Sequence, residues 1–271
     1  MNETLKRSIS GTIYVFLLIA CILYSTESFF ILFGIFLLIA VVEFCDLVQI
    51  NKTISLLIAV TSYFLFYSTR SKPALVLTLS ALAVTILVAV KCMLFLFNIK
   101  SNLINSFSKY TYLIGYIILP FVFITKIPFG DNGYNPKIII GIFILIWTND
   151  TFAYIIGKSI GKRKLFERVS PNKTIEGFIG GVIFAIIASY IIAKYYIEIK
   201  EANTYIWIII AIIISVFGTI GDLVESKFKR IAGVKDSGII MPGHGGILDR
   251  LDSVIFVAPI VFLFYQILNY L

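Results

Sequence analysis

The chain has 271 residues, of which 59% are apolar and only 14% are charged, and its mean hydropathy is +0.97. Ordinary globular proteins carry about 25% charged residues, so this composition excludes one or two water-soluble domains. The net charge of +8 does not indicate a nucleic-acid partner, because the positive residues lie in short segments between apolar runs.

Apolar runs of near-spanning length recur along the whole chain and predict an all-α polytopic membrane protein with about nine transmembrane helices. We expect the first run to be a membrane span and not a cleaved signal peptide, because it continues past Cys21. Only four residues, 25–28, separate the first two spans, and so short a connection predicts a tight helical hairpin. The predicted spans are about Ile9–Tyr24, Phe29–Phe44, Ile54–Tyr67, Ala74–Val90, Tyr110–Ile124, Ile138–Ile156, Phe178–Tyr195, Tyr205–Leu223 and Val254–Tyr270.

The distribution of Lys and Arg predicts the orientation of these spans in the membrane. If the N-terminus is cytoplasmic, 17 of the 23 Lys and Arg residues fall on the cytoplasmic side and 6 on the other. The positive-inside rule then favours a cytoplasmic N-terminus and, with nine spans, a C-terminus on the opposite face. We divide the chain into N-terminal and middle helices (1–135) and a C-terminal transmembrane region (136–271), whose two long charged loops we expect to be cytoplasmic. The expected location is the cell (inner) membrane.

The first motif region follows the middle of the sixth span. Asn149 and Asp150 interrupt an apolar run, so we expect them to face the protein interior or a water-filled cavity. Gly157 and Gly161 have the spacing of a helix-packing motif, but the neighbouring lysines favour a cytoplasmic helix end. We expect 170–173, which includes Lys173, to cap and start the seventh span.

The eighth span runs into a second group of charged residues. In a helix, Asp222, Glu225, Ser226 and Lys229 share one face, at offsets of 3, 4 and 7. The charges could simply pair at a solvated helix end. Asp222, however, follows at least fifteen mostly apolar residues, and a carboxylate at that depth costs about 2.5–3.5 kcal/mol unless a cation compensates it.

The ninth span begins at 248 and carries Asp249 and Asp252 one turn apart. Acidic residues also favour a helix N-terminus through the macrodipole, which explains one aspartate well and two tolerably. Three glycines in four residues, around the only histidine, His244, precede this helix. Backbone N–H groups of such a turn, including those of Gly245 and Gly246, can form an anion-binding nest beside the helix N-terminus.

His244 could act as a general base, a metal ligand or a phosphate hydrogen-bond donor, and donation to phosphate suits a Gly-rich loop best. A zinc site is not expected, because no second His or nearby Cys completes it. Cys21, Cys45 and Cys92 lie in or beside apolar runs without a Cys-x-x-Cys pair, so we expect no disulfides.

These two regions resemble the motifs of phosphatidate cytidylyltransferases, also called CDP-diacylglycerol synthases. The C-terminal motif is SxFKRx4KDxG from Ser226, followed by HGGx2DRxD from His244. The upstream motif includes Asn149-Asp150, Gly157, Gly161, Ser170-Pro171, Lys173-Thr174 and Glu176-Gly177. The resemblance is specific over roughly 147–253; before that, only length and hydropathy agree.

The resemblance implies a reaction in which CTP and phosphatidate, a membrane lipid, give CDP-diacylglycerol and diphosphate. It also implies a requirement for Mg2+, which K+ can accompany, and it suggests a homodimer. The nucleophile is an ionised phosphate oxygen, so the chemistry needs cations and in-line geometry more than a strong base. The expected metal ligands are Asp222, Asp249 and Asp252. The expected phosphate-neutralising residues are Lys229, Arg230, Lys235, His244 and Arg250, and Asp236 belongs to the same catalytic motif. The expected substrate-binding residues are Asn149, Asp150, Lys173, Ser226, Gly245 and Gly246.

Two other classes of function remain open at this point. A CTP-dependent polyprenol or lipid kinase would also combine CTP with a membrane lipid. An ion-coupled transporter would use Asp150 and Asp222 at a midmembrane site, although the sequence lacks the paired interrupted spans of such transporters. The Asp-Gly-x2-Ala-Arg run of CDP-alcohol phosphotransferases is absent from the sequence.

Overall fold

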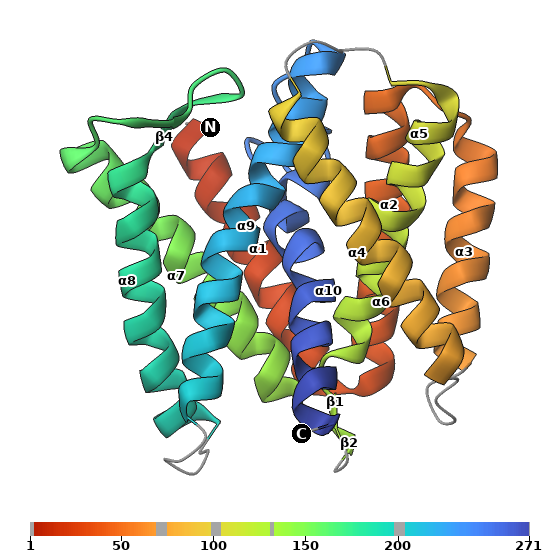
Figure 1. Cartoon of the computed structure of the whole chain (residues 1–271), viewed down its shortest axis with the longest axis horizontal. Coiled ribbons are helices and arrows are strands. Elements are labelled where there is room, and N and C mark those ends of the chain that lie inside the picture. Colours follow the sequence, from red (N-terminus) through yellow and green to blue (C-terminus); the bar gives the residue numbers. More distant parts are fainter. Residues whose placement is uncertain (1–2, 69–74, 99–103, 131–132, 198–203, 271) are drawn as a thin grey trace.

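The computed structural model describes residues 3–68, 75–98, 104–130, 133–197 and 204–270, without side chains at 3–4 and 269–270. Within these residues the chain forms a bundle of roughly antiparallel helices with two short hairpins (Figure 1). The helices are α1 Glu3–Tyr24, α2 Thr26–Val48, α3 Lys52–Ser68, α4 Leu75–Phe97, α5 Ser106–Tyr112, η1 Leu113–Ile118, α6 Leu119–Lys126, α7 Pro136–Ile160, α8 Ile175–Ile191, η2 Ile192–Tyr196, α9 Thr204–Ala232 and α10 Leu248–Tyr270, where η1 and η2 are π-helical turns. The hairpins are β1 Phe129–Gly130 with β2 Gly133–Tyr134, and β3 Lys164–Phe166 with β4 Ser170–Thr174.

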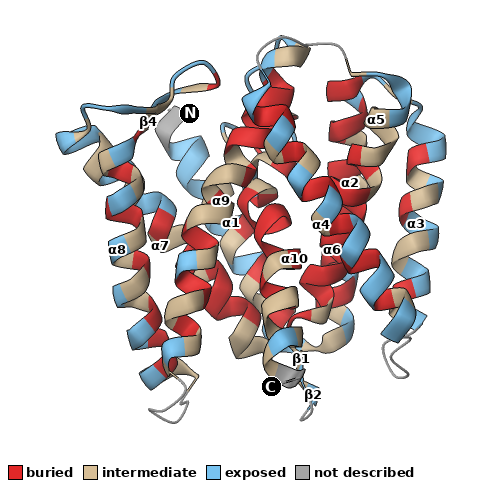
Figure 2. Ribbon diagram, viewed as in Figure 1, coloured by how far each residue is buried: buried red, intermediate tan, exposed pale blue. Residues whose placement is uncertain are grey.

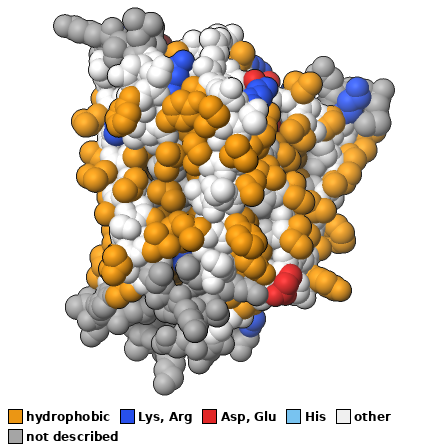
Figure 3. Space-filling model, turned by 90° about the vertical axis from the view of Figure 1, so that its right-hand side faces the viewer, with side chains coloured by type: hydrophobic (Ala, Val, Ile, Leu, Met, Phe, Trp, Pro, Cys, Tyr) orange, Lys and Arg blue, Asp and Glu red, His pale blue; other side chains and the backbone are white. Residues whose placement is uncertain are grey.

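The predicted architecture, an all-α polytopic membrane protein, is confirmed. Eight helical segments are long and apolar enough to cross a membrane, among the described residues, and α3, at the third of the nine predicted spans, is a shorter apolar helix. Hydrophobic side chains cover most of the height of one face, while most of the visible charged side chains lie towards its two ends (Figure 3). This pattern matches a bundle whose sides contact hydrocarbon.

The predicted hairpin between the first two spans is also confirmed. Ser25 alone separates α1 from α2, and its side chain accepts a hydrogen bond from the Ser28 backbone N–H in a reciprocal capping box. The start of α1 and the end of α10 lie at opposite ends of the bundle, as an odd number of crossings requires (Figure 1). Four cations used for the orientation, Arg70, Lys72, Lys100 and Lys200, lie outside the described residues.

The best-buried helices form the centre of the bundle (Figure 2). α2 and α10 expose few side chains, and aromatic rings connect α2 to α9. The Phe44 ring on α2 lies 5.3 Å from the Phe228 ring on α9, centroid to centroid, and the Tyr116 ring stacks on Phe228 at 5.8 Å. This contact fixes α2 against the helix that carries the second motif.

Helices α7 and α8 pack closely because small residues line their contact. A Cβ added at Gly181 would lie 2.8 Å from the Asn149 backbone oxygen, and one added at Gly157 would lie 3.5 Å from the Cα of Gly177. Gly161 caps the C-terminus of α7. The segment from Gly157 to Gly161 is therefore both the end of a helix and a site of close contact between two helices.

One local prediction was wrong. Residues 170–173 do not start the seventh span but form strand β4, whose register pairs Phe166 with Ser170 and Lys164 with Thr174. A two-stranded hairpin tolerates Pro171, which lacks an N–H, because one edge of each strand is free. Helix α8 begins only after Thr174, whose side chain accepts a hydrogen bond from the Gly177 N–H.

Candidate active site

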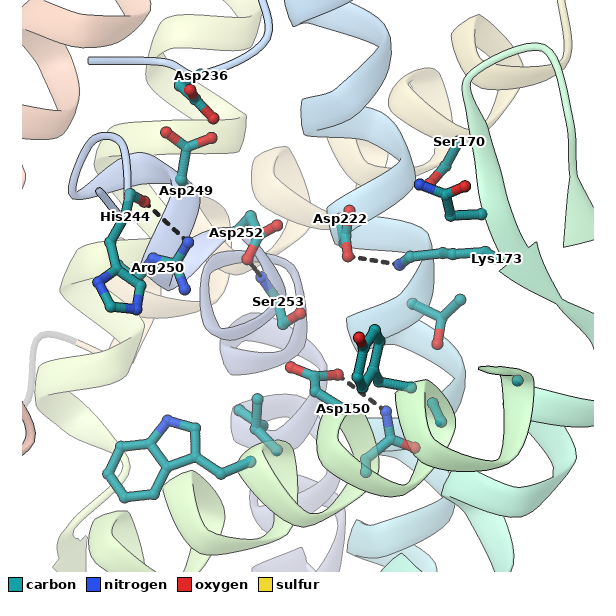
Figure 4. Close-up of a pocket in the computed structure, with 18 of the residues that line it drawn as sticks. Asp150, Ser170, Lys173, Asp222, Asp236, His244, Asp249, Arg250, Asp252 and Ser253 are labelled. Atoms are coloured by element: carbon teal, nitrogen blue, oxygen red, sulfur yellow. Dashed lines mark hydrogen bonds and ion pairs between the residues drawn. The ribbon is translucent and has the colours of Figure 1, made fainter. Parts of the chain in front are cut away.

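A cavity of about 980 Å³ brings the two motif regions together. Its walls come from α1, α7, β4, α9, the loop between α9 and α10, and the first turns of α10 (Figure 4). Of the residues predicted for the site, those lining it are Asn149, Asp150, Lys173, Asp222, Lys229, Arg230, Lys235, Asp236, His244, Asp249, Arg250 and Asp252. Side chains more than 100 residues apart in sequence thus share one polar cavity.

Three carboxylates from three helices face this cavity. Asp150 on α7, Asp222 on α9 and Asp252 on α10 are directed towards a shared space (Figure 4). The negative charges of Asp150 and Asp222 repel that of Asp252, and the charge of Asp222 also repels that of Asp150. Lys173 from β4 partly offsets this negative charge, because its ammonium lies 2.5 Å from an Asp222 oxygen. A concentration of like charges in a helical bundle favours cation binding.

Asp249 has a different environment from these three. Its Oδ1 accepts a hydrogen bond from Lys229 Nζ at 2.6 Å. Its Oδ2 accepts from the backbone N–H of Ser237, the hydroxyl of Ser237 and the backbone N–H of Gly246, each at 2.8 Å. Oδ2 therefore holds the loop between α9 and α10 in its observed fold, while Oδ1 joins α10 to Lys229 of α9.

The predicted phosphate nest is used within the protein itself. The Gly246 N–H donates to Asp249, and the next two N–H groups, of Ile247 and Leu248, donate to Glu43 on α2 at 3.0 and 2.8 Å. Gly245 has a positive φ of 85°, and a Cβ there would lie 2.5 Å from Asp249 Oδ2. Gly245 and Gly246 do not line the cavity, and their lack of a side chain lets carboxylates approach the backbone.

The face predicted on the eighth span exists, but its charges pair with one another. Lys229 forms ion pairs with Glu225, one turn away, and with Asp249 on α10. Ser226 does not line the cavity and instead donates to Asp222 Oδ1 at 3.2 Å. Lys229 thus connects α9 to α10, and Ser226 orients Asp222 towards the cavity.

Lys227, which belongs to the same charged stretch, points away from the cavity. Its ammonium donates to the backbone carbonyl oxygens of Phe95, Leu96 and Asn98, at the end of α4, the bond to Asn98 being 2.8 Å long. The last carbonyl groups of a helix lack partners within the helix, so this lysine caps α4. The sequence gave Lys227 no role in the site, and this contact shows a structural role for it.

His244 lies where the loop meets α1. Its Nδ1 is hydrogen-bonded to Ser10 Oγ at 2.8 Å, and its backbone oxygen accepts from Arg250 Nη2 at 2.8 Å. Gly11 leaves room for the imidazole, since a Cβ there would lie 3.3 Å from the ring. Partial burial, then the charges of Arg250 and Arg7, lower the pKa of His244 below its ordinary value. A neutral imidazole can donate one hydrogen bond and accept another.

Three further predicted residues lie on the loop side of the cavity. Lys235 and Asp236 line it directly. Arg230 lines it too and donates to the backbone oxygens of Val169 and Val234 at 3.4 and 3.3 Å. These residues therefore place two cations and a carboxylate at the end of the cavity nearest the loop.

The contribution of α1 and of Glu43 escaped the sequence analysis. Gly11, Tyr14 and Val15 form a wall of the cavity, although the first span carries no carboxylate or motif that would have signalled it. Glu43 and Asp46 lie at the end of the second predicted span, where the sequence left open whether they line the cavity or sit at the membrane interface. A carboxylate near the end of an apolar run was the available signal.

The described residues include no group of three His, Cys, Asp or Glu side chains close enough to hold a metal ion. Carboxylate oxygens of the kind that Mg2+ prefers are nevertheless present, since Asp222 and Asp252 both face the cavity. The predicted ligand set of Asp222, Asp249 and Asp252 stays a prediction, and the contacts of Asp249 favour a role in the loop.

Fold and site together define a polytopic membrane protein whose helices enclose a cavity lined by paired carboxylates and cations. The chain belongs to the Cytidylyltransferase family, which it matches over residues 5–268. It is 53% identical over 119 residues to a phosphatidate cytidylyltransferase of Staphylococcus haemolyticus and 52% identical over 121 residues to that of Staphylococcus saprophyticus. The same-named protein of Staphylococcus epidermidis is 50% identical over 119 residues. Each alignment covers 44% of this chain and 45% of the relative, so the chain spans about half the length of the curated relatives it matches.

Proposed function

We propose that this protein transfers the cytidylyl group of CTP to phosphatidate, giving CDP-diacylglycerol and diphosphate for phospholipid biosynthesis. The observation that carries the proposal is a single cavity, inside an apolar bundle, lined by five carboxylates together with Lys173, Arg250 and His244. Membership of the Cytidylyltransferase family and the names of its relatives support the same reaction.

The reaction requires two anionic groups to approach each other. An oxygen of the phosphatidate phosphate forms a bond to the α-phosphorus of CTP, and the bond from that phosphorus to the diphosphate oxygen breaks. We infer that Lys173 on one wall and Arg250 on the other offset the charge of the phosphates. Because the attacking oxygen is already ionised, His244 acts as a hydrogen-bond donor to phosphate and not as a base.

We also propose Mg2+ as the resident cation. Asp222 and Asp252, with Asp150 beside them, would hold it through carboxylate oxygens. When bound, Mg2+ would draw negative charge from the phosphate oxygens. Asp249 is left out of this set because its two oxygens accept four hydrogen bonds, from Lys229, Ser237 and Gly246. Each oxygen of Asp222, by contrast, has one partner among the described residues.

A lipid substrate is supported by a second cavity of about 710 Å³ beside the first. The two share Gly11, Val15 and His244. Its lining is polar at one end, with the Arg7 cation and the His244 imidazole, and becomes apolar further along α1, with Phe16 and Ile19. A groove of this kind suits a lipid phosphate at the polar end and acyl chains along the helix.

We propose that the loops between α7 and α8 and between α9 and α10 face the cytoplasm, where CTP is available. The positive-inside distribution of Lys and Arg supports this orientation. The bacterial relatives support the cell membrane as the location.

Labelled CTP tests the reaction against its closest alternative. Detergent-purified protein is given phosphatidate, Mg2+ and CTP that carries 32P at the α or at the γ position. A cytidylyltransferase moves the α label into extractable lipid and releases the γ label as diphosphate. Lipid that carries only the γ label would instead identify a lipid kinase, and solute uptake into proteoliposomes without CTP would identify a transporter.

A further inference from the structure

Glu43, on the second helix, lies almost 200 residues from the motif loop in the sequence and touches that loop directly. Its side chain is only 4% exposed. One oxygen accepts from the Ile247 N–H at 3.0 Å, and the other accepts from the Leu248 N–H at 2.8 Å and the Ser237 hydroxyl at 3.1 Å. Ile247 and Leu248 open α10, so this carboxylate caps a helix to which it is not connected in sequence.

Two glycines of the motif loop fit this contact. A Cβ on Gly246 would lie 2.4 Å from both Glu43 oxygens, and one on Gly238 would lie 2.5 Å from Oε1. A Cβ atom does not approach a non-bonded atom within 3.0 Å in folded proteins, so a side chain at either position would displace the Glu43 carboxylate. The two glycines therefore serve the approach of a protein carboxylate to the loop backbone.

The helix that carries Glu43 is itself held firmly. Its neighbour Phe44 packs against Phe228 of α9, the helix of Asp222, with 5.3 Å between ring centroids. A negative charge at a helix N-terminus is stabilised by the helix dipole as well as by its hydrogen bonds. Glu43 thus transmits the position of α2 and α9 to the first turns of α10, where Asp249, Arg250 and Asp252 are located.

We propose that Glu43 is a positioning residue that sets the register of the first turns of α10 in the cavity. It acts through Ile247, Leu248 and Ser237 and touches no substrate. Its effect on turnover rests on the proposed function; its effect on the loop does not. A displacement of about 1 Å in reacting groups can slow catalysis about 10²-fold, so a small change of register is measurable.

The test is Glu43→Gln, which keeps the shape and places an amide where N–H donors require an oxygen. Hydrogen–deuterium exchange of peptides that cover 244–251 should rise at least tenfold, while exchange in the other described helices stays within twofold of the parent. The kcat for diphosphate release should fall about 10–100-fold. The KM for CTP should rise no more than threefold, because Lys173 on the opposite wall is untouched.

Asp46→Asn is the matched control. Asp46 lies one turn from Glu43 on the same helix, is 58% exposed and pairs only with Lys52 among the described residues, so exchange and kcat should match the parent. Gly238→Ala is the second variant, for use where Glu43→Gln does not fold. The nearest atoms to its Cβ all belong to Glu43, so it should displace this carboxylate and raise exchange at 244–251 by a smaller factor.

Each outcome decides the proposal. An increase in exchange confined to 244–251, together with a reduced kcat, supports it. Exchange and kcat that match the parent in Glu43→Gln, or in Gly238→Ala where only that variant folds, overturn it. Exchange that rises evenly over all helices also overturns it, because Glu43 then supports the whole fold. If the parent itself transfers no cytidylyl group, the proposed function fails, and the exchange experiment still decides whether Glu43 positions the loop.

Discussion

Asp249→Asn separates the two roles open to this carboxylate: metal ligand and organiser of the motif loop. Asp249 is 6% exposed and accepts four hydrogen bonds, one from the Lys229 ammonium and three from Ser237 and Gly246. An Asn can retain the three bonds only by turning its amide nitrogen towards Lys229. The substitution therefore removes one charge-assisted bond and weakens three others.

The size of the effect follows from these contacts. A hydrogen bond to a charged group contributes about 1.5–3 kcal/mol, and a neutral acceptor gives roughly half the strength of a charged one. The four changes together should lower the free energy of unfolding by about 3–5 kcal/mol. At about 2–4 °C per kcal/mol for a chain of this size, the melting temperature should fall by about 6–20 °C.

The assay measures thermal unfolding in detergent by tryptophan fluorescence and, below the transition, the Mg2+ concentration that gives half-maximal diphosphate release. We expect reduced stability and reduced kcat with a half-saturating Mg2+ concentration within twofold of the parent. A melting temperature within 1 °C of the parent, with Mg2+ requirement raised tenfold or more, would refute the assignment of Asp249 to the loop. Asp46→Asn should change neither quantity, because an exposed ion pair contributes about 0–1 kcal/mol.

Three further predictions concern single residues. Lys173→Gln leaves Asp222 without its ion pair and should lower kcat/KM for CTP at least tenfold, measured by diphosphate release; a value within twofold of the parent would contradict its role. Lys227→Met uncaps α4 and should lower the free energy of unfolding by about 2–5 kcal/mol while the KM for CTP stays unchanged, since Lys227 lies outside the cavity. Because the folded-state pKa of His244 is lowered, the neutral form stabilises the fold above about pH 6.5, and that stabilisation is lost as the pH falls below it. Melting temperatures from pH 5 to 8 should therefore fall on the acid side for the parent and fall less for His244→Asn.

The sequence predicted the helices well, because hydropathy is a local property of each segment. The third predicted span, Ile54–Tyr67, corresponds to α3, and the one-residue turn before α2 follows from the polar residues around Ser25. The gathering of Asp222 and Asp252 near one cavity could also be predicted, since each follows from helical spacing in a charged motif.

The partners of the charged groups could not be predicted. Lys227 and Lys229 are two residues apart on one helix but have different partners. Lys227 donates to a backbone oxygen at the end of α4, and Lys229 donates to Asp249. The Gly-rich turn has the composition of a phosphate nest, yet its N–H groups meet Glu43 and Asp249. Such pairings depend on packing between distant segments, which neither composition nor spacing encodes.

The account's central claim is that this cavity joins CTP to a lipid phosphate. Diphosphate release by the detergent-purified protein, with CTP and Mg2+, in the presence and absence of phosphatidate, tests that claim most directly. We predict release that requires phosphatidate, prefers CTP to ATP and stops when EDTA removes the metal. A folded protein that releases no diphosphate under these conditions, or releases it equally without phosphatidate, would contradict the claim.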